Sequence, residues 1–397
     1  MTSLSASIYD AVVIGAGPAG SATATHLARA GFAVLLLDRA RFPRPKPCAE
    51  YVSPGAVEAL HRLGALRAIL DERPARLRGM RVVGPDGVGF TGRFLRGTGL
   101  GVPRDRLDLH VAAAAERAGA QFLQGVTFES FAPARAGVSV HARSGGHALD
   151  IQARVAIGAD GLNSRVAHQL GLARRGGPTR AALVAHVLGV SGMSDVGEMH
   201  VGPTGYVGLA PLGGDVTNVA VVVDLERDRI RAPVCAALQE QLGRFPTLHG
   251  RLSDVEIVAP VRAVGPFGRT TRRASAERVL LVGDAADFYD PFTGEGVYAA
   301  LKGAELAADC AALALGSERL EAKHLAAYDR MRRQAFLAKW TLERIVSRVI
   351  SRPWALGHVA ARLARRPEMA DVLVSVTAHA APPSRVFRPS YVWRLVA

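Results

Sequence analysis

The chain has 397 residues, 49% hydrophobic and 21% charged, which predicts one large globular domain or two interleaved ones. The formal net charge is +14, but no recognition element combines arginines with interleaved aromatic residues, so we expect no nucleic-acid partner. Three widely spaced cysteines predict reduced thiols in a cytoplasmic protein and exclude a metal cluster. The sequence also predicts neither a signal peptide nor a membrane-spanning helix.

The first fifty residues predict a strand, a helix and a second strand. Residues 11–14 are an apolar strand, and residues 18–30 are a helix of small residues that Gly31 ends. Residues 32–37 form the second apolar strand, which Asp38 follows directly. This order is typical of a dinucleotide-binding unit.

Three glycines with the spacing G-x-G-x-x-G connect the first strand to the helix. Gly15 permits a tight turn, Gly17 lets the backbone approach a pyrophosphate, and Gly20 lets the helix and strand pack closely. The helix N-terminus offers unpaired N–H groups to the phosphates. Asp38 is placed to accept hydrogen bonds from ribose hydroxyls.

The chain then departs from the alternation of a soluble NAD dehydrogenase. A helix near 54–70 precedes strand-like segments at 78–94 and 99–104, which are rich in Gly and Arg. A helix over 106–118 leads into further strands over 120–133. An insertion after the second strand, with the sheet resumed later, fits a flavoenzyme better than a complete six-stranded nicotinamide domain.

The middle of the chain predicts an antiparallel sheet. Its strand-like segments cover 180–190, 198–212, 216–225 and 254–264, and a Gly213-Gly214-Asp215 turn joins the second to the third. Few ionisable residues occur in these strands, so we expect a mainly apolar substrate pocket. The candidate substrate contacts are His186, His200, Tyr206 and Tyr289, although each of the first three is more typical of an ordinary strand residue.

The C-terminal part predicts helices with a strongly basic character. Residues 330–366 contain ten Lys or Arg residues against the single acid Glu343. Apolar residues recur at Leu337, Trp340, Ile345, Val349 and Ile350. Two interpretations stay open: a helix packed on the preceding domain with a solvated basic face, or an apolar and basic lid that meets a membrane surface or accepts a lipid or carrier-tethered chain.

Four motifs together resemble a known superfamily. They are "VVIGAGPAG…LLLDR", "VPRDRLD", "AIGADGLNS" and "LLVGDAADFYDPFTGEG", in that order. The chain is similar over residues 8–310 to the FAD-dependent aromatic hydroxylases and geranylgeranyl reductases. The resemblance implies an α/β fold in which a Rossmann-type FAD-binding domain, a parallel sheet with helices, is interleaved with an antiparallel-sheet substrate domain and followed by a helical C-terminal segment.

The domain boundaries follow from this resemblance. The FAD-binding domain is expected to be discontinuous, over residues 1–76, 105–178 and 276–316. The substrate domain is expected over 77–104 and 179–275, and the helical segment over 317–397.

The resemblance also implies the residues that contact FAD. They are Gly15, Gly17, Pro18, Ala19, Gly20, Asp38, Arg39, Cys48, Arg104, Val126, Asp160, Gly161, Gly283, Asp284, Pro291, Gly294, Gly296 and Val297. Among them Arg104 would reach the flavin side, Val126 would offer a backbone contact to adenine, and Asp284 would bind the ribityl hydroxyls. Glycines after "LLVGD" would let the backbone lie against the flavin ring, where a Cβ would collide.

The expected reaction is oxygenation. The chain has no second G-x-G-x-x-G, so NAD(P)H is expected as a transient co-substrate. We expect an NAD(P)H-dependent monooxygenase that hydroxylates or epoxidises a hydrophobic aromatic, polyketide or phenolic-lipid substrate through a flavin C4a-hydroperoxide. Tyr206 and Cys48 are the catalytic candidates. Two other interpretations of Cys48 stay open: a thiol of a loop near the flavin with no chemical role, or a packing residue.

The alternative is a reductase of isoprenoid carbon–carbon double bonds. The segment "KPC" resembles a loop of the geranylgeranyl reductases, with Cys48 at the matching cysteine, but Ala49, Glu50 and Tyr51 stand where the reductases have glycines. Halogenation is not expected, because the comparable region reads "GYVGLAPLGG" and lacks the Trp-x-Trp-x-x-Pro signature of halogenases.

Overall fold

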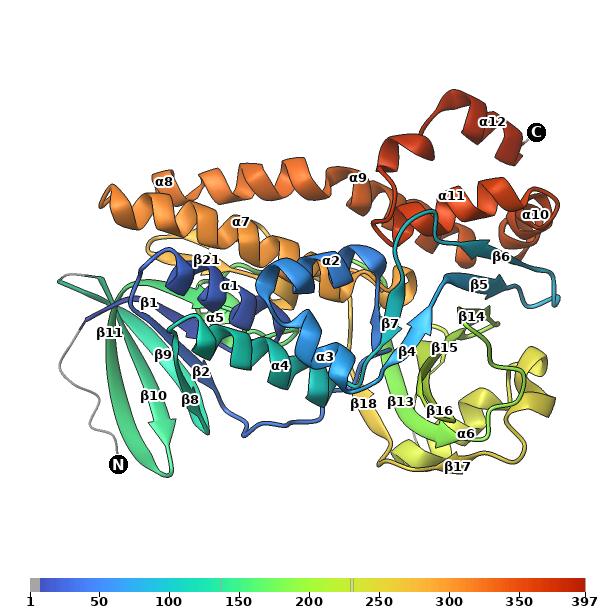
Figure 1. Cartoon of the computed structure of the whole chain (residues 1–397), viewed down its shortest axis with the longest axis horizontal. Helices are drawn as coiled ribbons and strands as arrows, with labels where there is room; N and C mark the ends of the chain where they lie inside the picture. The colour runs from blue at the N-terminus through green and yellow to red at the C-terminus, as the bar shows by residue number, and fades with distance from the viewer. Residues whose placement is uncertain (1–7, 136, 229, 231, 397) are drawn as a thin grey trace.

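A computed structural model describes residues 8–396 except residues 136, 229 and 231. Figure 1 shows a parallel sheet at the N-terminal end of the molecule and an antiparallel sheet at the other end, with long helices across both. The structure therefore has the expected mixed α/β fold with a Rossmann-like part, antiparallel sheets and C-terminal helices.

The first sheet is built on parallel strands in the order β21-β11-β1-β2-β8. Its strands are β1 (Tyr9–Ile14), β2 (Val34–Asp38), β8 (Gln121–Gln124), β9 (Val126–Ala134), β10 (Gly137–Ser144), β11 (His147–Gly158), β20 (Ser275–Ala276) and β21 (Val279–Leu281). In the middle of the sheet Val13 pairs with Leu36 on one side and Ile157 on the other, and all three are fully buried. Burial on both faces explains why these strands read as continuous apolar runs rather than as alternating ones.

The helices of this part agree with the sequence except at their ends. They are α1 (Pro18–Arg29), α2 (Pro54–Leu63), α3 (Leu66–Asp71), α4 (Arg104–Arg117), α5 (Arg165–Gln169) and α7 (Gly296–Gly316). The expected single helix near 54–70 is wrong: it is two helices, because Gly64 has a φ of +78° and ends α2. The helix expected from residue 106 begins at Arg104.

The second sheet is mainly antiparallel, in the order β17-β13-β16-β15-β14-β5-β6, with β18 paired to β13. Its strands are β5 (Gly79–Val83), β6 (Gly89–Arg93), β13 (Arg180–Leu188), β14 (Gly197–Val201), β15 (Gly205–Gly213), β16 (Val216–Asp224), β17 (Glu256–Ile257) and β18 (Arg262–Val264). Only β14 and β5 among these pairs run parallel within the described residues. Gly213 and Gly214, both at positive φ, join β15 to β16 at the predicted turn.

Two small sheets and a few short helices complete the connections. The small sheets are β3 (Tyr51–Val52), β7 (Gly99–Gly101) and β4 (Ala75–Leu77), and β12 (Ala173–Arg175), β19 (Arg269–Thr271) and β22 (Asp287–Phe288). The other short elements are α6 (Val234–Leu242), η1 (Pro246–Arg251), η2 (Gly283–Ala285), η3 (Pro291–Thr293) and η4 (Pro383–Arg385).

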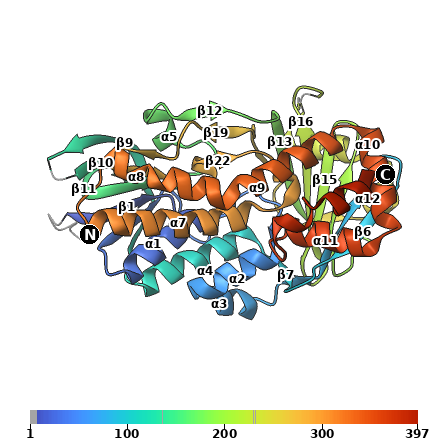
Figure 2. The ribbon, with the colours of Figure 1, turned by 90° about the horizontal axis from the view of Figure 1, so that it is seen from above.

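The C-terminal segment is helical, as expected. Its helices are α8 (Ala322–Leu325), α9 (Ala327–Ile350), α10 (Pro353–Ala364), α11 (Pro367–Thr377) and α12 (Pro389–Val396). Figure 2 shows α9 running beside α7 toward the second sheet, where α10, α11 and α12 gather. Among the helices of the described residues, none combines the length and apolar character needed to cross a bilayer.

The predicted apolar face of α9 is partly wrong. Ile350 is buried and Trp340 packs on the first core, but Leu337 is 58% exposed and Ile345 is 42% exposed. The buried face of α9 instead includes the charged residues Arg332 and Glu343. The reason lies in the tertiary structure, because α9 borders a cavity that can accept paired charges.

Candidate functional site

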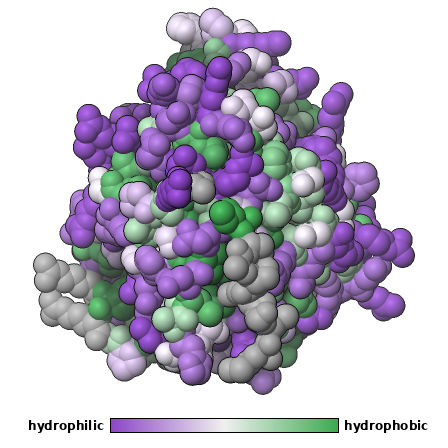
Figure 3. Space-filling model, turned by 90° about the vertical axis from the view of Figure 1, so that its left-hand side faces the viewer, coloured by the Kyte–Doolittle hydropathy of each residue, from purple (hydrophilic) through white to green (hydrophobic). Residues whose placement is uncertain are grey.

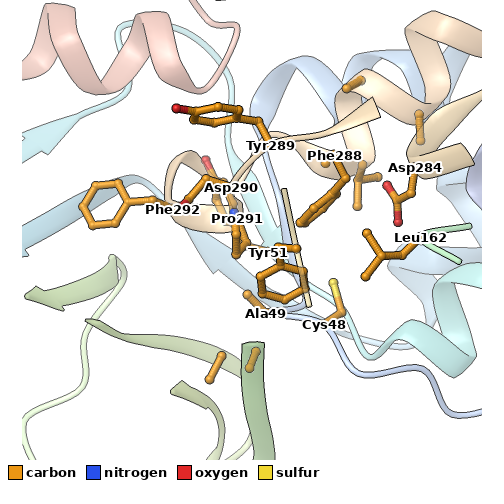
Figure 4. A pocket seen from close by; sticks show the side chains of 18 of the residues that line it. Cys48, Ala49, Tyr51, Leu162, Asp284, Phe288, Tyr289, Asp290, Pro291 and Phe292 are labelled. Atoms are coloured by element: carbon orange, nitrogen blue, oxygen red, sulfur yellow. Dashed lines mark hydrogen bonds between the residues drawn. The ribbon is translucent and has the colours of Figure 1, made fainter. Parts of the chain in front are cut away.

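A large cavity lies where the two sheets meet. It encloses about 1950 Å³ together with its open mouth. The loop after β1, the segment from Gly283 to Val297, the loop at Lys46–Tyr51, the second sheet and α9 all contribute to its wall. Figure 4 shows Cys48, Tyr51, Asp284 and Phe288 around one common space, although they are far apart in the sequence.

The glycines after β1 form a close turn against the sheet. A Cβ on Gly15, whose φ is +104°, would lie 2.4 Å from the carbonyl oxygen of Ala159, and one on Gly20 would lie 1.8 Å from that of Gly15. A Cβ on Gly17 would meet only the Arg44 guanidinium at 3.8 Å. Gly15 and Gly20 are therefore required by packing, whereas Gly17 leaves free space on the cavity side, beside Pro18 and Ala19, which also line the wall.

Asp38 at the end of β2 stabilises this turn. Its carboxylate accepts hydrogen bonds from the N–H groups of Ala16 and Ala40, each at 2.9 Å. The guanidinium of Arg44 lies 3.5 Å from Asp38 and 3.3 Å from Asp108. Arg44 was missed by sequence reasoning, since nothing in the order of residues indicates that it folds back over these two acids.

Arg104 lies inside the cavity wall, at the start of α4. It makes a bidentate ion pair with Asp108, with both nitrogen–oxygen distances at 2.9 Å. Burial alone would lower the pKa of Arg104, but Asp108 outweighs burial and raises it. A guanidinium fixed in this way is a permanent buried positive charge.

The segment from Gly283 to Val297 forms the next part of the wall. Asp284 lies 4.0 Å from the ammonium of Lys46 and is about a quarter exposed. Gly294 has a φ of +68°, and a Cβ there would lie 2.6 Å from the Tyr51 ring, whereas a Cβ on Gly296 would meet only Phe288 at 4.0 Å. Pro291 and Val297 also line the cavity. Helix α7 begins at Gly296, so its free N–H groups and its partial positive charge lie at the cavity.

The residues of this wall fit a flavin dinucleotide. Gly17 and Gly296 leave space for a ligand where a Cβ would fill it. Among the described residues, Tyr51, which lines the cavity, has a buried hydroxyl without a hydrogen-bond partner. Unpaired buried polar atoms are costly in a native structure unless a ligand or water satisfies them.

The loop of Cys48 to Tyr51 connects the two sheets through one carboxylate. Glu50, at a φ of +57°, accepts hydrogen bonds from the N–H of Arg104 at 2.8 Å and from Asn218 at 2.9 Å. His186 lies 2.6 Å from the second oxygen of Glu50. Glu50, which stands where the reductases have a glycine, is thus fully hydrogen-bonded within the protein. The same loop still presents Cys48 to the cavity.

A second buried carboxylate fixes the segment before α7. Asp290 accepts hydrogen bonds from the hydroxyl of Tyr206 at 2.7 Å and from the N–H of Phe292 at 2.9 Å, and it pairs with Arg180. Burial raises the pKa of Tyr206 well above its ordinary value, and Asp290 adds to the effect. Tyr206 therefore stays neutral and lines the cavity with its hydroxyl already donated.

The other predicted substrate residues separate into two groups. Tyr289 lines the cavity. His186 is behind Glu50, and His200 is buried elsewhere, 2.8 Å from Glu198 and 3.0 Å from Thr247. Neither histidine belongs to the cavity wall, because each occupies a strand position whose side chain is already paired with a carboxylate.

Besides Gly15, Gly20 and Asp38, which stabilise the turn behind the wall, three further predicted FAD residues lie away from the cavity wall. Arg39 is exposed, Val126 is buried at the start of β9, and the carboxylate of Asp160 accepts hydrogen bonds from Ser164 at 2.5 Å and from the N–H of Arg165 at 2.7 Å. Asp160 thus stabilises the start of α5. Its neighbour Gly161, at a φ of +83°, does line the cavity.

Helix α9 supplies a charged wall that the sequence did not reveal. Arg332, Lys339 and Glu343 line the cavity together with Phe336 and Trp340. The cavity is mainly apolar, as expected, but charged groups on this side and Glu198 on the second sheet interrupt the apolar lining. The only available signal was the i, i+4 spacing of Lys339 and Glu343, in a chain that has just four lysines.

A cavity lined by a dinucleotide-type turn, a buried guanidinium and a helix N-terminus defines a flavoprotein oxidoreductase. The family model of the FAD binding domain matches residues 8–340, and the chain belongs to this family of group A flavoprotein monooxygenases. The protein is therefore an FAD-dependent oxidoreductase.

Known proteins are similar along most of the chain. Digeranylgeranylglycerophospholipid reductase 1 of Methanothermobacter thermautotrophicus is 33% identical over 341 residues, which are 82% of either chain. The myxobacterial chondrochloren halogenase CndH is 25% identical, with a TM-score of 0.76 over 83% of this chain and 80% of the halogenase. A flavoprotein/dehydrogenase from Cytophaga hutchinsonii, 20% identical, shares the fold with a TM-score of 0.83 over 94% of this chain and 93% of its own.

Proposed function

We propose that the protein is an FAD-dependent reductase that saturates carbon–carbon double bonds of a polyprenyl-type lipid. The observation that carries this proposal is the cavity wall on the second sheet, which, beside Glu198, Tyr206 and a few larger apolar residues, is rich in small apolar residues. They are Ala182, Val184, Gly197, Gly208, Ala210, Ala220 and Val222. Such a wall leaves room along the sheet for a long apolar chain that carries small methyl branches.

The similarity to the digeranylgeranylglycerophospholipid reductase supports the same choice, because that relative is named for a polyprenyl lipid. The loop Lys46-Pro47-Cys48, which resembles the reductases, lies on the cavity. FAD, when bound, would supply the hydride for the reduction. NAD(P)H remains our proposal for the donor that renews the reduced cofactor.

Residue roles follow from the geometry as part of this proposal. Gly17, with the free space beside Pro18 and Ala19, would accept the pyrophosphate, and Arg104 with Lys46 would balance its charge. Asp284 would accept hydrogen bonds from the ribityl hydroxyls. The α7 N-terminus at Gly296 would face the flavin and favour negative charge on a reduced ring. The discontinuous domain boundaries expected from the sequence remain part of the proposal.

Oxygenation is the second candidate, because the chain belongs to a family of monooxygenases and the apolar wall would also exclude water from an oxygen-reactive intermediate. One experiment separates the two. The FAD-loaded enzyme is incubated with geranylgeraniol in detergent micelles, once without oxygen under dithionite and once in air with NADPH. Saturated product in the first vessel supports the reductase, whereas oxygen uptake with a product heavier by one oxygen atom supports the monooxygenase.

We also propose that the C-terminal helices meet a lipid surface. Trp354 is 76% exposed and Trp393 is 71% exposed, although tryptophan is rarely so open in a soluble surface. In α12 the residues Val392, Trp393 and Val396 point outward while Tyr391 and Leu395 pack on the protein. Arginines around them would favour an anionic bilayer, from which a lipid substrate could enter.

A further inference from the structure

Three buried charged groups share one corner of the cavity. The ammonium of Lys339 lies 2.5 Å from Glu343 and 3.5 Å from Glu295. The side chains of Lys339, Glu343 and Glu295 are only 9%, 8% and 3% exposed. Glu295 directly precedes α7, and its second partner is His379 at 3.3 Å.

The charges of this cluster do not balance when both acids are ionised. Lys339 can neutralise one carboxylate, and the nearby Asp287 is already paired with Arg332 and accepts a hydrogen bond from Trp340 at 3.0 Å. A buried carboxylate without a matching cation costs several kcal/mol of free energy. Binding one proton removes this surplus charge, so one of the two glutamates should hold a proton.

The contacts select Glu343 as the protonated residue. Glu295 has Lys339, His379 and the positive end of α7 around it, all of which favour its ionised form. Glu343 has only Lys339 as a hydrogen-bond or ion-pair partner within the described part of the chain. Burial raises the pKa of Glu343 to about 7; Lys339 opposes the rise, and Glu295 and Asp287 add to it.

Glu343 is also on the correct side of the cavity. It lines the wall together with Lys339, whereas Glu295 does not. One turn further along α9, Val346 packs in the same apolar cluster as Tyr206 and Phe292. The acid therefore faces the chamber between the N-terminus of α7 and the small-residue wall of the second sheet.

We propose that Glu343 is the acid that gives a proton to the substrate during double-bond saturation. This proposal rests on the proposed reductase function. Saturation of a C=C bond needs a hydride equivalent, which carries two electrons, and one proton. The Oε–H bond of Glu343 breaks, the π bond opens, and a C–H bond forms at the carbon that the hydride does not reach. Lys339 stabilises the carboxylate that remains, and a proton from water restores the acid.

The outer end of the cluster reaches toward solvent. His379 is stacked on Tyr298 at a centroid distance of 3.6 Å and its side chain is 15% exposed. The charged groups that act on Glu343 are Lys339 on α9, Glu295 before α7 and Asp287 on β22. Arg332 pairs in turn with Asp287, and His379 with Glu295. A change in any of these charges is expected to move the pH at which Glu343 loses its proton.

The test compares Glu343→Gln with Glu343→Asp and with Glu58→Gln, a matched change at an exposed glutamate paired with Arg62. Saturation of geranylgeraniol under dithionite is followed from about pH 5 to about pH 9. The wild-type rate should fall as the pH rises through about 7, where Glu343 ionises. Glu343→Gln should lower the rate about 10²–10⁴-fold and remove this decline, Glu343→Asp should restore part of the rate, and Glu58→Gln should change neither.

A second measurement detects the proton on Glu343 without an activity assay. Infrared difference spectra of the FAD-loaded protein across the same pH range should show a protonated carboxyl band that Glu343→Gln abolishes and Glu58→Gln retains. Equal flavin absorbance in all variants shows that the site is intact. A band or a pH profile that survives in Glu343→Gln overturns the proposal. If the wild type saturates no geranylgeraniol, the reductase function itself is wrong, whereas the infrared band still identifies the protonated residue.

Discussion

At the scale of single residues, the site depends on acids whose neighbours decide their charge. Asp284 lies at the cavity beside Lys46 and makes no other ion pair among the described residues. Glu50 and Asp290 are buried and fully bonded within the protein. The carboxylate of Asp284 is therefore available to a ligand, whereas those of Glu50 and Asp290 stabilise the protein around the cavity.

Asp284→Ala is expected to lose FAD, because the ribityl hydroxyls would lose a charged acceptor. The measurement is the ratio of flavin to protein absorbance after gel filtration. Asp309→Ala, at an exposed position on α7, is the matched control and should keep its flavin. Full flavin occupancy in Asp284→Ala would refute the role proposed for this residue.

Glu198 predicts a dependence of stability on acid pH. Burial alone would raise its pKa, but hydrogen bonds from His200 and Arg251 outweigh burial and lower it to about 2, from an ordinary 4.5. A lowered carboxyl pKa stabilises the protein above the unfolded value and loses this contribution as the pH falls toward the folded one. Urea unfolding should therefore show a loss of about 3 kcal/mol between about pH 5 and about pH 2 that Glu198→Gln lacks.

Glu198→Gln should be less stable than the wild type at neutral pH, because His200 and Arg251 would face a neutral amide in a buried site. The same stability difference at pH 7 and at pH 3 would contradict the assignment.

At the scale of elements, η3 joins the first part of the molecule to the second sheet at the cavity. Its N-terminal residue Asp290 accepts a hydrogen bond from Phe292 within the element and another from Tyr206 on β15. Arg180 on β13 pairs with the same carboxylate. One side chain therefore sets the position of Pro291 to Gly294 relative to the second sheet.

Asp290→Asn is expected to destabilise the protein by about 3–5 kcal/mol, because the buried Arg180 would lose its close partner and keep only Asp224, 4.0 Å away, as counter-charge. Equilibrium unfolding in urea measures the change. The control is Asp195→Asn, whose partner Arg93 is about half exposed, and we expect it to cost about 1 kcal/mol or less. Equal effects of the two substitutions would show that Asp290 does not fix η3.

At the scale of the whole molecule, the two ends differ in their surfaces. Figure 3 shows mainly hydrophilic side chains, with scattered apolar ones, on the end of the molecule where β9–β11 lie. The exposed tryptophans Trp354 and Trp393 belong to α10 and α12, at the opposite end. An apolar substrate wall and exposed tryptophans in one molecule fit an enzyme that takes its substrate from a lipid surface.

Trp393→Ser is expected to weaken binding to vesicles that contain anionic lipid, because an indole that enters the interface would be lost. Co-sedimentation with vesicles measures binding, and added salt should weaken it for the wild type. The control is Leu313→Ser, which removes another exposed apolar side chain, 75% exposed, near the end of α7. Equal binding of both variants and the wild type would contradict a docking role for α12.

Local patterns in the sequence determined the FAD-binding part. The turn at Gly15, Gly17 and Gly20 follows from the spacing G-x-G-x-x-G, and the apolar strands on either side predict a buried parallel sheet. The turn at Gly213-Gly214 was likewise predicted from adjacent residues. Features of this kind can be read from the order of residues because their causes lie within that order.

Only the tertiary structure decided which charges meet in the cavity. In the sequence, Lys339 and Glu343 belong to a basic helical segment, His186 and His200 are candidates for substrate contact, and Glu50 is a departure from the glycines of the reductases. Folding pairs Glu50 with Asn218 and His186, moves both histidines off the wall, and places Lys339 beside Glu295. The reason is that a buried charge is stabilised by partners distant in sequence, and their approach depends on packing between elements rather than on any local pattern.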